Sequence, residues 1–294
     1  MSITSLAAVP SVHRACPVFR GRIGQDARSG HYAVPHRYRL HLSTACPDGL
    51  RLAVGHSLLG LDAGCPVTVL PAVPDCPGGG HAALRPLYEA SAHHYTGPAL
   101  APVLSDDWSG RIVSTEARDI LRDLDRFPHE GGAALYPSGQ ESVIEAVEAM
   151  CDAIEEAAQC AGRAGTGPVE RAAALDALFD TLGRLESRLT EEEYLVDDRL
   201  TAADVELWVT LVQLDMVHRC HLDASAVHRI AAHRALWVYA GRLAARPAFG
   251  RHLDLEGISR RHHGRCQGLE AAGAAVQILD WAGRAADTED ASRR

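Results

Sequence analysis

The spacing of apolar residues changes once along this chain of 294 residues, near residue 139, and that change constrains the fold most. Before it, apolar residues alternate with polar ones or form short runs bounded by Pro and Gly, as in 38–42 and 67–70. Such segments are typical of β-strands. After it, apolar residues recur every three or four positions, which is typical of amphipathic helices. The chain is therefore predicted to hold a mixed α/β part followed by an all-α part.

The first part is predicted to have the order β-α-β-loop-β-β-α, a small mixed sheet with helices. The predicted strands are 38–42, 67–70, 101–104 and 111–113, and the predicted helices follow Pro47 and cover 116–124. The Pro- and Gly-rich stretch 71–81 is predicted to be a loop. Residues 1–36 lack any sustained periodicity and are interpreted as an N-terminal arm. The first domain is accordingly predicted to span residues 37–128.

The second domain is predicted to span residues 139–285 and to be helical throughout. Its predicted helices run through 143–154, 175–189, 205–217 and 236–243, with a last amphipathic segment at 268–283. Thr201 and Asp204 form a capping-box pattern, in which the third helical residue reaches back to the cap. The helix beyond the box is apolar nearly all round, so it is expected to run through the core.

Composition excludes several functions. The sequence contains no lysine, so all 29 basic residues are arginine, which excludes Schiff-base chemistry and a phosphate-binding P-loop. The net charge of -9 argues against a nucleic-acid or anionic-membrane partner. No apolar run approaches the ~20 residues of a membrane-spanning helix. The eight cysteines form no CxxC pair, which favours a reducing compartment, and the protein is expected to be cytoplasmic.

Cys46 and Pro47 stand between the first predicted strand and the first predicted helix. Proline suits the first position of a helix, where its missing N–H would have no partner. Cys46 would then occupy the N-cap, where free backbone N–H groups and the helix dipole favour an anion. A cysteine placed in this way is a candidate nucleophile because its thiolate form is stabilised.

The segment Ala101-Pro102-Val103 begins the third predicted strand. A cis proline there would turn the backbone toward a ligand, and we expect the bond before Pro102 to be cis. An active-site cysteine after the first strand and a cis proline before the third make up a thioredoxin-like arrangement.

Several dispersed motifs now resemble one known family. They are Arg37-Tyr38-Arg39-Leu40-His41-Leu42 with Ala45-Cys46-Pro47 and Arg51, Tyr95-Thr96-Gly97 before Ala101-Pro102-Val103-Leu104, Ile112-Val113-Ser114-Thr115-Glu116, and Leu200-Thr201-Ala202-Ala203-Asp204 followed by Leu211-Val212-Gln213-Leu214-Asp215. In order and spacing they resemble the glutathione transferase superfamily, and most closely its xi class, the glutathionyl-hydroquinone reductases. The resemblance covers roughly residues 37–266.

The resemblance implies a thioredoxin-like N-terminal domain, an α-helical C-terminal domain, an active cleft between them and a homodimer. It implies glutathione or another low-molecular-weight thiol as cosubstrate, and a small electrophile or thioether as substrate. Cys46 would attack a thiol adduct of a quinone-like molecule. The thiol would be bound by Pro102, Val103, Thr115, Glu116 and Ala117, with Val103 offering its backbone and Glu116 meeting the γ-glutamyl amino group.

The chain departs from the family pattern around this site. Asp48 stands where the family has Trp, Ala117 stands where it has Ser, and the loop 71–85 lacks the family Trp. The segment 154–159 lacks the family Tyr. Family tyrosines are replaced by His218 and by the pair His262-His263. These three histidines and Arg51 are predicted to contact the substrate, and the departures suggest a thiol other than glutathione in a specialised pathway.

Two other functions compete with this interpretation. The first is a non-catalytic, transferase-like binding or scaffold protein, in which the departures mark lost catalysis. The second is a metal-binding protein that uses His218, His221, His262 and His263 with Cys220 and Cys266. These ligands follow no standard spacing and would have to come from separate helices, so no metal is predicted.

Overall fold

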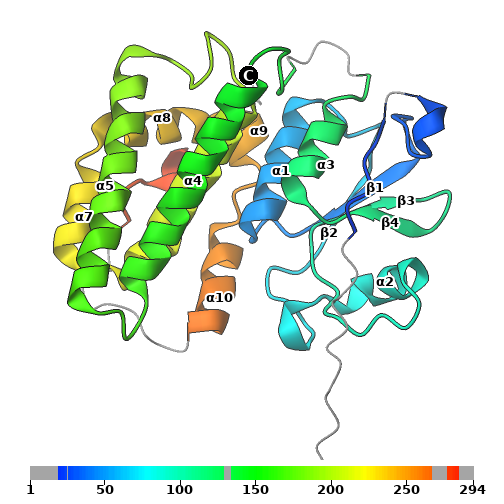
Figure 1. The fold of residues 1–294 in the computed structure, drawn as a ribbon, viewed down its shortest axis with the longest axis horizontal. Helices are drawn as coiled ribbons and strands as arrows, with labels where there is room; N and C mark the ends of the chain where they lie inside the picture. The colour runs from blue at the N-terminus through cyan, green and yellow to red at the C-terminus, as the bar shows by residue number, and fades with distance from the viewer. Residues whose placement is uncertain (1–18, 25, 129–133, 267–276, 285–294) are drawn as a thin grey trace, which may run out of the picture.

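A computed structural model describes residues 19–24, 26–128, 134–266 and 277–284 of the chain (Figure 1). A four-stranded sheet with its helices occupies one side of the view, and a bundle of longer helices occupies the other. We call residues 38–124 the sheet half and residues 141–266 the helical half. A mixed α/β part followed by an all-α part is the arrangement that the change in periodicity predicted.

The sheet contains β1 (Tyr38–Leu42), β2 (Val67–Val69), β3 (Val103–Asp106) and β4 (Arg111–Ser114) in the order β2-β1-β3-β4. Strand β2 runs parallel to β1, whereas β3 is antiparallel to both β1 and β4. All four predicted strands are confirmed. Strand β3 begins after Pro102 rather than at residue 101, because proline has no N–H to donate to the ladder.

Three helices belong to the sheet half. Helix α1 (Pro47–Leu58) and helix α3 (Ala117–Leu124) pack together, as predicted, and bury Leu50, Leu52 and Leu121 in the main core. Helix α2 (Arg85–Ser91) was not predicted, since it is short and offers few apolar residues at helical spacing. It packs near β4, and its Tyr88 belongs to a second, smaller core.

The helical half contains α4 (Glu141–Gly162), α5 (Pro168–Glu191), α6 (Ala202–Met216), α7 (Ala224–Ala231), α8 (Arg234–Ala244), α9 (Pro247–Gly250) and α10 (Leu255–Cys266). A short 3-10 helix, η4 (His218–His221), follows α6. The predicted capping box at Thr201 and Asp204 is present, and every residue of α6 is buried. Helices α7 and α10 were not predicted, and most of the predicted segment 268–283 lies outside the described residues.

A single hydrophobic core extends through both halves. Helix α1 packs against α6, and the buried residues of α4, α5 and α8 continue the same cluster. Trp208 at its centre is fully buried and packs edge-on against Phe249 and Trp281. The start of α1 is therefore held by the sheet from one side and by the long helices from the other.

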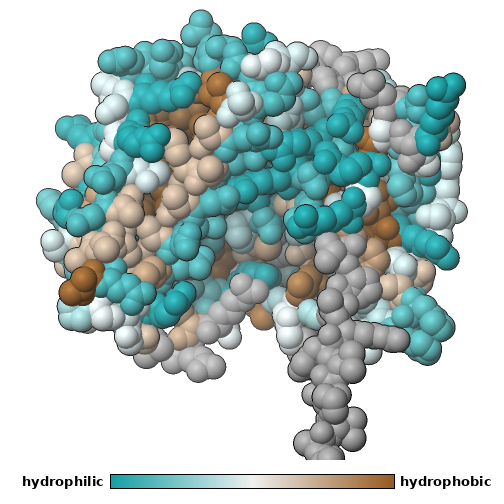
Figure 2. All heavy atoms as spheres, viewed as in Figure 1, coloured by the Kyte–Doolittle hydropathy of each residue, from teal (hydrophilic) through white to brown (hydrophobic). Residues whose placement is uncertain are grey.

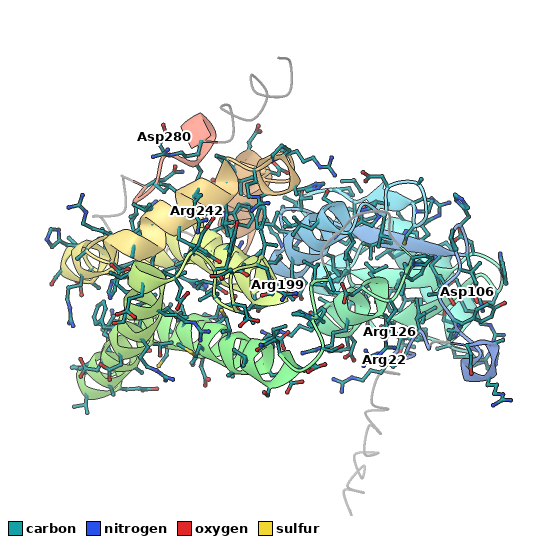
Figure 3. All side chains as sticks on the ribbon, turned by 90° about the horizontal axis from the view of Figure 1, so that it is seen from above. Arg22, Asp106, Arg126, Arg199, Arg242 and Asp280 are labelled. Atoms are coloured by element: carbon teal, nitrogen blue, oxygen red, sulfur yellow. The ribbon has the colours of Figure 1, made fainter. Side chains whose placement is uncertain are left out.

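The N-terminal arm, where it is described, adds a short extended segment to the free edge of β4. The Gly21 N–H donates to the Val113 carbonyl over 2.8 Å, and the Thr115 N–H donates to the Phe19 carbonyl over 3.0 Å. Arg22 and Arg126, labelled side by side in Figure 3, both pair with the buried Asp123. The arm is thus anchored to α3.

Hydrophilic residues cover most of the face seen in Figure 2, and the most hydrophobic residues form small, separate patches. Among the described helices, none combines the length and the apolar character needed to cross a bilayer.

Candidate active site

Cys46 caps the start of α1, as predicted. Its backbone is extended, with φ -103° and ψ 137°, and Pro47 occupies the first position of the helix. The Cys46 N–H donates to the Ser43 carbonyl over 3.1 Å, while its carbonyl accepts from the Leu50 N–H over 2.8 Å. Cys46 as a residue is 9% exposed and counts as buried. It therefore lies at the helix N-terminus with little access to solvent.

The turn that holds Cys46 depends on a close approach at Gly49. A Cβ atom added there would lie 2.0 Å from the carbonyl oxygen of Ser43. This distance is well inside van der Waals contact, so any side chain at residue 49 would push the turn away from the helix. Gly49 thus allows the 43–46 turn to fold down on α1.

The predicted thiol-binding residues gather at one end of the sheet. Strand β1 ends there, β3 begins there and β4 ends there, because β3 is antiparallel to both neighbours. Pro102 therefore lies near the end of β1, and Thr115, Glu116 and Ala117 directly follow the end of β4. The bond between Ala101 and Pro102 is cis, as predicted.

Val103 lies inside the sheet rather than at its rim. The Asp107 N–H donates to the Arg37 carbonyl over 2.8 Å, and hydrogen-bonded pairs alternate from there along β1 and β3. His41 and Val103 fall on a hydrogen-bonded position, so the Val103 backbone is engaged within the ladder. Ala101, just before the strand, has backbone groups for which the described residues supply no hydrogen-bond partner. It was missed from sequence.

Glu116 is the N-cap residue of α3, and Arg20 from the N-terminal arm approaches its carboxylate to 3.6 Å. The neighbouring Thr115 donates both its N–H, over 3.0 Å, and its hydroxyl, over 3.4 Å, to the Phe19 carbonyl. Ala117 is buried. The arm thus lies directly beside the residues expected to meet the γ-glutamyl end of a thiol peptide.

A pocket of about 170 Å³ opens at the start of α1, and we call it the α1 pocket. Ala45 and Pro47, on either side of Cys46, form one wall, and α4, α6 and α10 form the others. Its lining residues are Ala45, Pro47, Glu155, Gln159, Gln213, Val217, His218, Ile258, Arg261 and His262. The volume is close to that of the cavities of ~150 Å³ that hold one benzene ring.

Two polar side chains of the α1 pocket stand out by their surroundings. The Gln213 side-chain amide nitrogen is buried without a hydrogen-bond partner in the part of the chain that the structure describes, and the residue is 7% exposed. A buried donor without a partner is costly, so it is a natural contact for a polar ligand. Burial raises the pKa of Glu155, and the nearby Glu206 carboxylate adds to the effect against the attraction of Arg51. Glu155 is therefore suited to hold a proton.

The three predicted histidines separate in the structure. His218 and His262 both line the α1 pocket. Burial lowers the pKa of His218 to about 4, with nearby His221 and His262 contributing, so its imidazole is neutral at pH 7. His263 is exposed, and its Nδ1 lies 2.7 Å from the Ser259 carbonyl, within one turn of α10. The structure does not bring His263 to the pocket.

Arg51 points away from the α1 pocket into a chain of ion pairs that we call the ion-pair network. Arg51 is 5% exposed, and its Nη2 donates to the carboxylate of Glu206, on α6, over 2.8 Å. The same carboxylate accepts from Arg118, on α3, over 2.7 Å, and Arg118 pairs in turn with Asp152 at 2.6 Å. Asp48 also pairs with Arg51. Arg51 therefore joins the sheet half to the helical half through its ion pair with Glu206.

Sequence reasoning missed Glu155, Gln159, Gln213 and Arg261. One signal was present, because Gln213 is a polar residue inside a helix predicted to be apolar nearly all round. Glu155 and Gln159 are four residues apart on one face of α4, which is visible in the sequence but resembles an ordinary solvated face. Arg261 sits on α10, a helix that was not predicted. Its direction toward the pocket is a matter of tertiary packing.

Comparison with known proteins agrees with this architecture. Residues 168–256 match the family model described as "Glutathione S-transferase, C-terminal domain". The chain is 31% identical over 265 residues to the glutathionyl-hydroquinone reductase PcpF of Sphingobium chlorophenolicum, covering 84% of this chain and 82% of that protein. It is 28% identical over 280 residues to the glutathionyl-hydroquinone reductase YqjG of Escherichia coli, covering 89% and 84%.

Solved structures give the same result. A xi-class glutathione transferase from Natrialba magadii superposes with a TM-score of 0.75 at 26% identity, covering 90% of this chain and 87% of that one. The glutathione-bound structure of YqjG superposes with a TM-score of 0.74 at 25% identity, covering 87% and 91%.

Proposed function

The chain belongs to the glutathione transferase family, among its xi-class glutathionyl-hydroquinone reductases, and from this premise we propose that Cys46 is the nucleophile of a thiol-dependent reductase. The proposed substrates are thiol adducts of small, quinone-like aromatic molecules. One observation carries the proposal: Cys46 caps α1 between the two residues that form a wall of a ring-sized pocket. Helix N-termini are suited to hold anions, and the pocket beside Cys46 is large enough for one aromatic ring.

The proposed reaction has two steps. The Cys46 thiolate attacks the sulfur of the thioether, so an S–S bond forms and the bond between sulfur and the ring carbon breaks. The ring carbon keeps the electron pair and takes up a proton, which yields the reduced hydroquinone. A second thiol then attacks the mixed disulfide, releases the oxidised thiol and restores Cys46.

Glu155 is the proposed proton donor for the ring carbon. Its pKa is raised by burial, and it lines the same pocket as Ala45 and Pro47. A carboxyl group that stays protonated nearer neutrality can act as a general acid. Gln213 would bind a ring oxygen, since its buried amide has no hydrogen-bond partner within the described residues. His218 and His262 would complete the polar lining, whereas Arg51 and His263 would contribute no direct contact.

The cosubstrate is proposed to be glutathione or another low-molecular-weight thiol, bound by residues 37–128, while residues 139–285 bind the ring. The backbone of Ala101 and the segment from Thr115 to Ala117 would hold the thiol peptide. Ala117 has no hydroxyl to offer a γ-glutamyl carboxylate, and Arg20 approaches the Glu116 carboxylate that would meet the γ-glutamyl amino group. This site therefore favours glutathione over a thiol without a γ-glutamyl group less than the family pattern would. The active form is proposed to be a cytoplasmic homodimer, which sedimentation would check.

A direct assay tests the proposal. Purified protein is given a glutathionylated hydroquinone and, in parallel, a panel of small thiols as the second reactant, and the free hydroquinone is quantified by chromatography. Cys46→Ser should lower the rate by about 10³-fold or more, because serine is a poor nucleophile toward sulfur. In the wild type, mass spectrometry should detect a mixed disulfide at Cys46.

Cys76→Ser is the matched control, since Cys76 is a half-buried cysteine of the same half that lies in a loop. It should keep full activity. A Cys46→Ser variant that releases hydroquinone at the wild-type rate would contradict the proposal and would favour a binding or scaffold protein, as would a wild type without turnover on any thiol of the panel.

A further inference from the structure

Three side chains with metal-binding atoms meet where η4 crosses α10. The Nε2 atoms of His221 and His262 are 3.2 Å apart, and the Cys266 sulfur is 3.0 Å from the His221 Nε2. The ligand atoms of all three residues lie within 4.8 Å of one another. His262 and Cys266 are one helical turn apart on α10, so both face η4. The two contacts of His221 join distant parts of the chain, because His221 lies 41 residues from His262 and 45 residues from Cys266 in the sequence.

Hydrogen bonding alone satisfies this arrangement poorly. A neutral imidazole nitrogen carries either one proton or one lone pair in the plane of the ring. The Nε2 of His221 can therefore form one well-aligned bond, yet it faces a second ring nitrogen and a sulfur at hydrogen-bond distance. A cation placed between the three atoms would use the lone pairs of all of them at once.

We propose that His221, His262 and Cys266 form a Zn²⁺ site. In a tetrahedral zinc site, bonds of 2.0–2.1 Å to nitrogen and 2.3 Å to sulfur place two nitrogens about 3.3 Å apart, and a nitrogen and a sulfur about 3.6 Å apart. The observed nitrogen–nitrogen separation, 3.2 Å, is close to the first value. The observed nitrogen–sulfur separation, 3.0 Å, is shorter than the second, so the Cys266 sulfur would move outward by about 0.6 Å on binding. The remaining pair, His262 and Cys266, needs at most a modest inward rotation of side chains.

The donor set favours a borderline or soft cation. Two imidazoles and one thiolate suit Zn²⁺, whereas Mg²⁺ and Ca²⁺ prefer oxygen ligands. Binding removes the thiol proton of Cys266, which passes to solvent, and leaves both imidazoles neutral. His262 is 8% exposed, so the ion would be shielded on that side.

The described residues supply three ligands, and a tetrahedral site takes a fourth. His262 lines the α1 pocket, while His221 and Cys266 line a second hollow of about 410 Å³. Gln159, Val217 and His218 border both cavities. The ion would thus sit between the two, where water or an oxygen of a bound molecule can complete the tetrahedron. The site does not rest on the proposed function, because Cys46 takes no part in it.

Metal analysis tests this site. The full-length protein is stripped with a chelator, titrated with Zn²⁺ against a chromophoric competitor, and analysed by inductively coupled plasma mass spectrometry. We expect one Zn²⁺ per chain, and His262→Ala or Cys266→Ser should weaken binding by about 10²-fold, because each removes one of three ligands. With Co²⁺ in place of Zn²⁺, the wild type should show a thiolate-to-cobalt absorption band that Cys266→Ser abolishes.

Two matched variants serve as controls. His263→Ala changes the exposed neighbour of His262, and Cys220→Ser changes the cysteine next to His221, yet neither residue belongs to the three-residue group. Both should bind Zn²⁺ like the wild type, as should Cys46→Ser. Absence of stoichiometric Zn²⁺ would overturn the site, and so would unchanged binding by Cys266→Ser. If the variants do not fold, a wild type whose cobalt spectrum lacks the thiolate band also overturns it.

Discussion

Buried polar groups have different partners on the two sides of the start of α1. On the side of the ion-pair network, Arg51 and Glu206 are almost fully buried, at 5% and 2% exposure, and the carboxylate is shared with Arg118. On the side of the α1 pocket, Gln213 is 7% exposed, and its amide nitrogen has no hydrogen-bond partner among the described residues. The buried charges of the network pair with opposite charges across the two halves, although Arg51 and Arg118 each keep one Nε without a hydrogen bond to this part of the chain. Gln213 has no charged partner there, but it lines a pocket in which a ligand could accept from it.

Because of this difference, we expect substitutions at Arg51 and substitutions at the pocket residues to affect different properties of the protein. Removing one member of a buried ion pair leaves the other charge desolvated and unpaired. Replacing an amide that has no partner removes an existing penalty instead. Stability should therefore respond on the network side, and substrate binding on the pocket side.

The largest effect is expected at Arg51. Arg51→Ala leaves the Glu206 carboxylate buried beside a single remaining arginine, so the free energy of unfolding should fall by about 3–5 kcal/mol in urea denaturation. The double variant Arg51→Met with Glu206→Leu should regain much of this loss, since Arg118 keeps its pair with Asp152 and Asp48, which loses Arg51, is half-exposed to water. If Arg51→Ala lowers the free energy of unfolding by less than about 1 kcal/mol, the network is no stronger than ion pairs on the surface, and the proposed difference between the two sides of α1 is wrong.

Gly49→Ala should affect both sides at once. The new methyl group would collide with the Ser43 carbonyl, so the turn carrying Cys46 must shift. We expect a loss of up to about 3 kcal/mol in stability, the upper part of the range for overpacking, together with a loss of reductase activity. Gly183→Ala serves as the control: it has open space around it inside α5, so it should keep the activity and raise stability by about 0.5–1 kcal/mol, as expected for alanine in a helix interior. Normal activity of Gly49→Ala would show that the turn tolerates displacement.

Glu155 provides the pH dependence of the pocket side. Its raised pKa means that the acid form persists to higher pH than for an ordinary carboxyl group, and activity should fall as pH rises through that pKa. Glu155→Gln should lower kcat/KM by about 10²-fold, as for the loss of a general acid, and should abolish this descending limb. The pH profile of kcat/KM for the two proteins is the measurement. An unchanged limb in the variant would assign it to another group.

Gln213→Leu is expected to have the smallest effect of these variants, and it separates substrate binding from stability most clearly. The free energy of unfolding should fall by less than about 1 kcal/mol or should rise, because the buried amide without a partner among the described residues is removed. KM for the aromatic substrate should rise by about 10-fold, the equivalent of about 1.4 kcal/mol for one lost hydrogen bond. Denaturation and steady-state kinetics on the same preparation give both values. A large loss of stability without a change in KM would make Gln213 a structural residue.

Much of the fold was predictable because its signals are local. The Cys46 N-cap with Pro47, the capping box at Thr201 and Asp204, and the four strands each depend on neighbouring residues. Helices α2, α7 and α10 were missed because they are short or rich in charged residues, and they form by packing on elements distant in sequence. The predicted site had the same limit. Cys46 and Pro102 follow from local motifs, whereas Arg51 has a favourable sequence position but a side chain that turns toward Glu206.

The sequence alone determined the two-part architecture and the cysteine at a helix start, since these follow from periodicity and from the preference of proline for the first position of a helix. The cis bond before Pro102 was expected from the place of this proline in a thioredoxin-like arrangement. Only the tertiary structure decided which of the adjacent His262 and His263 faces the pocket, that Arg51 joins the halves, and that His221 meets Cys266. Those outcomes depend on how helices rotate and cross, and a helix turns by about 100° per residue, so neighbours in sequence point in different directions.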